Sequence, residues 1–89
     1  LLFPLVVLNA RPEATLASKA ETLRMLAQRV KHLERKIDFY LSAADMWKEA
    51  GHLDEDWADY QQAFDLDPSR PVVRRFAGDF TTFRYAIQR

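Results

Sequence analysis

Apolar residues recur at helical spacing along most of the chain, and the longest such run precedes Gly51. Pro12 and Glu13 suit the first turn of a helix, and neither proline nor glycine occurs again before Gly51. Leu, Ala, Met, Arg, Lys, Glu and Gln dominate this run, and all of them are good helix formers. The pattern therefore predicts one long amphipathic helix over residues 13–50.

The apolar positions of this predicted helix form two rows that repeat every seven residues. Rows of this kind are typical of a narrow seam that packs against another helix, from the same chain or from a different one. The pattern leaves open whether the helix is continuous or breaks between Lys31 and Lys36. The first row contains Leu16, Leu23, Val30, Ile37 and Ala44, and the second contains Leu26, Leu33, Tyr40 and Trp47.

Two shorter helices are expected after Gly51. The first covers residues 55–66, with Asp54 as its N-cap and Asp67–Pro68 as its end. The second covers residues 70–88, and Ser69 is available to cap it. Together with the long helix, these elements make the predicted fold class all-α. The apolar face of the last helix consists of Val73, Phe76, Phe80, Phe83 and Ile87.

The first twelve residues form an apolar arm that does not fit a regular helix, because Pro4 interrupts it. Its eight apolar residues, Leu1–Leu8, are too few to cross a bilayer, which needs about 20. We expect a docking arm or a buried extended segment. The alternatives are a frayed end and the remnant of a membrane-spanning or signal segment. Because the first residue is leucine rather than methionine, we also expect a fragment or a processed form.

Length and charge refine this picture. A chain of 89 residues makes a single domain with a thin core, and it has no cysteine for a disulfide or a thiolate metal site. The absence of cysteine is compatible with an intracellular protein without deciding the compartment. The net charge is zero, but the chain is basic up to Ser42, acidic from Ala43 to Asp67, and basic again afterwards. Such blocks favour oppositely charged protein surfaces as partners.

No combination of residues predicts a catalytic, cofactor-binding or metal site. His32 lies among basic residues of the long helix and is interpreted as a surface residue. His52 lies in a turn beside acidic residues, which helix capping explains without a metal. Glycine-rich phosphate loops and nucleophile motifs do not occur. We therefore expect no enzymatic activity, and the neutral overall charge disfavours nucleic acid as a partner.

Residues 37–68 have the spacing of a helical hairpin in which small residues allow two helices to approach and aromatic residues fill the gap between them. This stretch, from about Ile37 to Pro68, resembles a single tetratricopeptide repeat. Asp56 departs from the family pattern, which has a small residue at that position. The resemblance implies a scaffold that binds peptide segments or helices in a concave groove. The positions that carry it are Tyr40, Ala43, Ala44, Trp47, Gly51, Tyr60, Ala63, Phe64, Leu66, Asp67 and Pro68.

The predicted function is protein–protein interaction or scaffolding, as a small accessory subunit or fragment within a larger complex. In the predicted fold the N-terminal half of the long helix has no cover within the chain, so it should bury its apolar row against another protein. Two alternatives remain open: a coiled-coil homodimer, and a membrane-attached subunit in which Leu1–Leu8 ends a spanning helix. The candidate partner interface consists of Leu16, Leu23, Leu26, Val30, Leu33, Phe76, Phe80 and Phe83.

Overall fold

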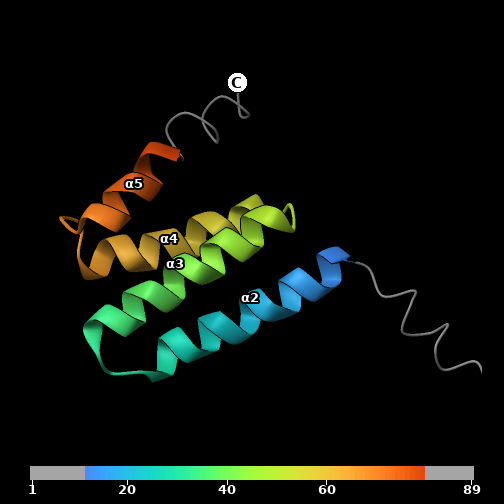
Figure 1. Cartoon of the computed structure of the whole chain (residues 1–89), viewed down its shortest axis with the longest axis horizontal. Coiled ribbons are helices and arrows are strands. Elements are labelled where there is room, and N and C mark those ends of the chain that lie inside the picture. The colour runs from blue at the N-terminus through green and yellow to red at the C-terminus, as the bar shows by residue number, and fades with distance from the viewer. Residues whose placement is uncertain (1–11, 80–89) are drawn as a thin grey trace, which may run out of the picture.

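The computed structural model describes residues 12–79, which form consecutive α-helices joined by short turns (Figure 1). The helices are α2 (Pro12–Arg29), α3 (Leu33–Glu49), α4 (Leu53–Leu66) and α5 (Pro71–Asp79). No strand occurs within these residues. The all-α fold class expected from the periodicity is therefore confirmed. In Figure 1, α3 lies between α2 and α4, and α5 follows the far end of α4.

The continuous helix predicted over residues 13–50 is wrong, because α2 and α3 are separate helices that run in opposite directions (Figure 1). Residues 30–32 make the turn between them. The last helical bond of α2 runs from the Val30 N–H to the Leu26 carbonyl at 2.9 Å, and the Lys36 N–H bonds the His32 carbonyl at 2.9 Å to begin α3. The chain therefore folds back at a place that has neither glycine nor proline.

The side chain of Lys36 stabilises this turn. Its ammonium group donates hydrogen bonds to the carbonyl oxygens of Ala27 at 2.6 Å, Val30 at 3.1 Å and Gln28 at 3.4 Å. The last carbonyls of a helix have no partner within the helix, and they carry the negative end of its dipole. A cation placed among them supplies both the missing donors and the favourable charge.

Small side chains bring α2 close to α3. Ala20 and Ala27 lie two turns apart on α2, and neither has any exposed surface; the same is true of Ala43 on α3. The distance between packed helices depends on the side chains at their contact, and alanine permits a short one. Ala20 and Ala43 form one small core cluster with Trp47, against which Leu23 and Met46 pack.

Gly51 produces the turn between α3 and α4. Its φ of +84° is in the left-handed region that glycine adopts at little cost. The Gly51 N–H bonds the Lys48 carbonyl at 3.0 Å, and the His52 N–H bonds the Trp47 carbonyl at 2.9 Å. This pair of bonds is the Schellman motif, which closes a helix C-terminus. The ending predicted at Gly51 is confirmed.

The helix predicted over residues 55–66 begins two residues earlier than expected, at Leu53. Asp54 is not its N-cap, because His52 precedes the helix and its carbonyl accepts the Asp56 N–H at 3.0 Å. Asp54, Glu55 and Asp56 instead occupy the first turn, where their charges meet the positive end of the helix dipole.

The last predicted helix, over residues 70–88, agrees with α5 as far as Asp79, and its remainder lies outside the described residues. Before it, the Asp67 Oδ1 accepts hydrogen bonds from the Ser69 N–H at 3.2 Å and from its hydroxyl at 2.9 Å. These bonds lower the pKa of Asp67. α5 joins the main core through Val73. That core consists of Ala27, Ile37, Tyr40, Leu41, Tyr60, Ala63 and Val73.

Candidate functional site

The predicted interface residues of the long helix occupy two different environments. Leu16, Leu23 and Val30 are half-buried, whereas Leu26 is 41% exposed and Leu33 is 45% exposed. The expectation that this row lacks cover within the chain is wrong for most of its length, because α3 packs along α2. What remains exposed is the end of the hairpin, where Met25 is also 47% exposed.

The predicted interface residues of the last helix are described only in part. Phe76 is half-buried, and it packs against the main core as one wall of a groove between α3 and α5. Phe80 and Phe83 lie outside the described residues. Of the aromatic residues that carry the repeat resemblance, Tyr40, Trp47 and Tyr60 are buried.

Trp57 and Phe64 on α4 are partly exposed, at 37% and 39%. The rings of Trp57 and Phe64 both contact the buried Tyr60 ring, at centroid distances of 5.6 Å and 5.9 Å. They are seven residues apart and therefore lie on one side of α4. This side contributes partly exposed aromatic surface.

A charge cluster that the sequence did not reveal connects α2, α3 and α4. Arg24 of α2 donates from Nε to the Asp59 Oδ1 and from an Nη nitrogen to the Glu55 Oε1, each at 2.7 Å. The Trp47 indole N–H donates to the other Asp59 oxygen, Oδ2, at 2.9 Å. The Arg24 guanidinium lies 5.3 Å from the centre of the Trp47 ring. This distance allows a cation–π interaction.

Burial and hydrogen bonding act in opposite directions on the pKa values of Asp59 and Arg24. Burial raises the pKa of Asp59, and the hydrogen bonds from Arg24 and Trp47 oppose that effect without cancelling it. Burial alone would lower the pKa of Arg24, but its hydrogen bonds with Asp59 and Glu55 outweigh burial and raise it. Both carboxylate oxygens of Asp59 have a donor, so the cluster can hold three helices in register.

A shallow polar pocket of 290 Å³ lies beside this cluster, between α2 and α4. Its lining includes Arg24, Asp59 and Tyr40 together with Gln28 and Gln62. Arg24 and Asp59 already bond each other, and this leaves the two glutamine side chains and the Tyr40 hydroxyl as the polar groups of the lining that could meet a ligand. The arrangement is suited to structural support rather than to proton transfer.

One feature of the sequence indicates a polar contact at this cluster, namely acidic residues on the buried face of α4. Asp56 and Asp59 fall on the same face of α4 as Tyr60 and Ala63, and all four are buried. An acid on the buried face of a helix requires a polar partner, because an unpaired buried charge is very costly. The identity of that partner cannot be predicted from the sequence, because Arg24 precedes Asp59 by 35 residues.

Acidic side chains follow the outer face of α3. They occupy positions 34, 38, 45 and 49, and Ser42 falls between them; the spacing places all five on one side of the helix. All five residues are exposed. Within the described residues, the one ion pair made by this set joins Glu34 to Arg70, at 3.8 Å. The remaining acids of this face, Asp38, Asp45 and Glu49, make no ion pair with any residue that the structure describes.

Two grooves border the outer face of α3. The groove between α3 and α5 has a volume of 230 Å³. Its lining is Asp38, Leu41, Ser42, Asp45, Val72 and Phe76.

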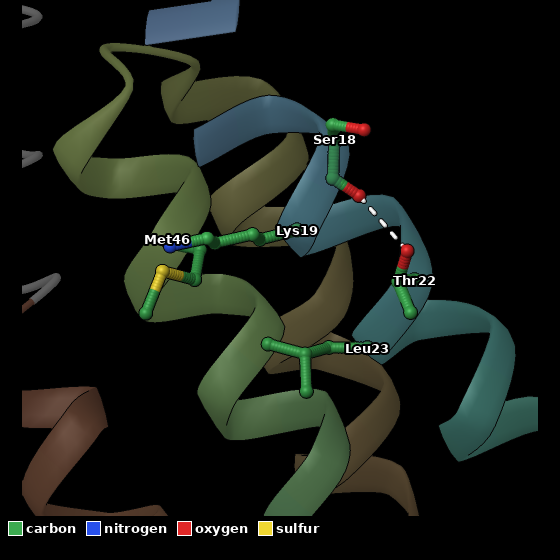
Figure 2. Close-up of a pocket in the computed structure, with 5 residues that line it drawn as sticks. All are labelled: Ser18, Lys19, Thr22, Leu23 and Met46. Carbon is green, nitrogen blue, oxygen red and sulfur yellow. Dashed lines mark hydrogen bonds between the residues drawn. The ribbon is translucent and has the colours of Figure 1, made fainter. Parts of the chain in front are cut away.

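The groove between α2 and α3 has a volume of 340 Å³ (Figure 2). Figure 2 shows Lys19 and Leu23 of α2 directed toward Met46 of α3, while the Thr22 hydroxyl bonds the Ser18 carbonyl at 3.1 Å. The two grooves differ in charge, because the first has two carboxylates at its rim and the second has one ammonium group.

The two histidines lie at the N-termini of α3 and α4. His32 is exposed, and the His52 ring contacts the Trp47 ring at a centroid distance of 5.4 Å. Among the described residues, no group of three or more potential ligands could hold a metal ion. None of the helices in this part of the chain is both long and apolar enough to cross a bilayer. Leu1–Leu8, on which the membrane alternative rests, lies outside it.

Comparison with protein-family models, with curated proteins and with solved structures gives no match for this chain.

Proposed function

We propose that this chain is a protein–protein interaction or scaffolding segment that works within a larger complex, with helices or peptide segments of other subunits as its partners. The observation that carries the proposal is the exposure of large apolar side chains at the α2–α3 turn, namely Met25, Leu26 and Leu33. Complete burial of one such side chain contributes about 1.5–3 kcal/mol. Because less than half of each side chain is exposed, a partner that covers this end of the hairpin would gain about half of that free energy per side chain.

The relation to tetratricopeptide repeats is part of this proposal. Its support is the pairing of α3 with α4, in which Ala44 and Ala63 have no exposed surface and let the helices approach closely. The departure at Asp56 is a buried acid within the first turn of α4. In this interpretation, α2 and α5 correspond to helices of neighbouring repeats, and α3–α4 is one complete repeat.

We propose an interaction role rather than catalysis because both carboxylate oxygens of Asp59, whose pKa burial raises, are engaged by Arg24 and Trp47. We rank the homodimer alternative second, since the seam that would pair two copies is divided between α2 and α3 and packs largely within the chain.

Site-specific photo-crosslinking in the producing cells tests the proposal. A benzophenone amino acid at position 26 should give a discrete adduct with a different protein. The same group at Glu21, an exposed position on the other side of α2, is the matched control and should not give that adduct. An adduct of twice the chain mass would establish self-association instead. Equal patterns from both positions, or none, would contradict the proposal.

A further inference from the structure

The groove between α3 and α5 combines an apolar floor with an acidic rim. Leu41, Val72 and Phe76 supply the apolar surface, and Asp38 and Asp45 stand at its edge. Leu41 is buried, whereas Val72 and Phe76 are half-buried. The groove volume of 230 Å³ is below the range of about 300–1,000 Å³ that small-molecule pockets occupy. It therefore suits one or two side chains of a larger partner.

The acidic face of α3 contains two pairs of like charges. Glu34 and Asp38 are four residues apart, as are Asp45 and Glu49, and like charges at this spacing destabilise a helix by about 0.2–0.5 kcal/mol per pair. Within the described residues only Glu34 has a cationic partner, Arg70. A cationic ligand on this face would relieve the repulsion and gain attraction at the same time.

Charge also distinguishes the two grooves beside α3. The groove toward α2 has Lys19 on its rim and no acid in its lining, whereas the groove toward α5 has Asp38 and Asp45. Charges across an interface are arranged in complementary fashion, and this arrangement selects the partner. A basic segment therefore fits the α5 side and is disfavoured on the α2 side.

We propose that the groove between α3 and α5 binds a basic amphipathic peptide segment of a partner protein. Its apolar side chains pack on Leu41, Val72 and Phe76, and its lysine or arginine side chains pair with Asp38 and Asp45. The proposal rests on the proposed interaction function and specifies the chemical class of one partner.

The test uses the 89-residue chain and two synthetic 18-residue amphipathic peptides, one of leucine and lysine and the other of leucine and glutamate. Fluorescence anisotropy at low and moderate salt should show binding of the lysine peptide, with affinity falling as salt rises. The glutamate peptide should not bind. Amide chemical-shift changes should map to Leu41, Ser42 and Val72 rather than to Leu23 and Met46.

Two variants and one control complete the experiment. Asp38→Asn with Asp45→Asn should weaken binding of the lysine peptide about two- to thirty-fold, since each of the two exposed pairs contributes about 0.2–1 kcal/mol. Ser42→Arg, at an exposed position of the groove, should weaken it further. The matched control, Glu21→Gln with Asp65→Asn, removes two exposed acids from other helices and should leave binding unchanged.

Three outcomes would overturn the proposal: equal loss in the control variant, shifts centred on the α2–α3 groove, or a change of oligomeric state in the Asn variant, which would make a second copy the occupant. The crosslink from position 26 separates this proposal from the general one. If that adduct forms while the affinity for the lysine peptide does not depend on Asp38 and Asp45, the interaction function stands and the groove assignment fails.

Discussion

Gly51 holds a left-handed backbone conformation with open space around it, since nothing lies within 4 Å of the position that a β-carbon would occupy. Replacing Gly51 by alanine should therefore cost only the backbone strain, about 1 kcal/mol of unfolding free energy. Asparagine tolerates this conformation better, so Gly51→Asn should lose less. Urea unfolding of the three proteins provides the measurement, and an alanine variant as stable as the wild type would contradict the turn geometry.

The raised pKa of Asp59 has a defined consequence for pH dependence. A carboxyl group that binds its proton more tightly in the folded state contributes most at low pH. Its contribution falls as pH rises through the window between its ordinary pKa of 3.8 and the raised value. The wild type should therefore lose stability relative to Asp59→Asn across that window. Acids that do not share Arg24 with Asp59 titrate in the same way in both proteins, so they cancel in the difference.

The measurement is the unfolding free energy of wild type and Asp59→Asn from pH 3 to pH 7. A difference that stays constant over that range would show that Arg24 and Trp47 balance burial at Asp59, and a change in the opposite direction would show that they outweigh it.

At the scale of the elements, the turn between α2 and α3 depends on one side chain. Lys36→Met keeps most of the aliphatic stem and removes the three hydrogen bonds to the end of α2. Hydrogen bonds to charged groups contribute about 1.5–3 kcal/mol, but part of this site is open to water, so we expect a loss of about 1–2 kcal/mol. Faster hydrogen exchange at the C-terminal end of α2 should accompany it.

The control for this prediction is Lys31→Met, which removes an exposed lysine from the same turn. It should change stability by a few tenths of a kcal/mol. Equal effects of the two substitutions would show that the carbonyls of Ala27 and Val30 do not need the Lys36 ammonium group.

The elements that could be predicted from the sequence are those marked by local chemistry. Gly51 and Pro68 end helices through backbone conformation alone, and the helix starts at Pro12 and Pro71 follow the same logic. The break at residues 30–32 has no such marker, because it depends on Lys36 reaching back by six to nine residues. A heptad pattern cannot distinguish a long helix from a hairpin whose two arms share the same apolar face.

The candidate site was predictable to a similar degree. Leu26 and Leu33 were identified from their place in the apolar rows, and they are exposed. The acidic face of α3 was not predicted, because charge blocks along the sequence do not show which side chains share one face of a helix. The groove beside this face forms because residues of α5 lie next to α3. Local sequence patterns do not predict such a tertiary contact.

At the scale of the whole molecule, α3 is the central element, since both α2 and α4 pack along it (Figure 1). Arg24 adds a direct link between the two outer helices through Asp59 and Glu55. The described fold is therefore a layer in which the central helix is covered on both sides while its acidic face stays open.

The turn also offers a stabilising substitution. His32 has a φ of −70° and a ψ of 120°, a conformation that proline adopts readily, and within the described residues no hydrogen bond is donated by its N–H. His32→Pro should raise the unfolding free energy by about 0.4–1 kcal/mol, because it restricts the unfolded chain. Thermal unfolding monitored by circular dichroism would show it, and a lower midpoint would refute the described turn.

Residues 30–32 join α2 to α3 without any residue that forbids a helix, and this gives the chain a second way to use the same contacts. If the turn straightens, α2 leaves its own α3, and the vacated surface is complementary to the α2 of another copy. Two such chains exchange arms and form a domain-swapped dimer. Proline at position 32 forbids the straight form, so dimers that form at high concentration in the wild type should be absent from that variant.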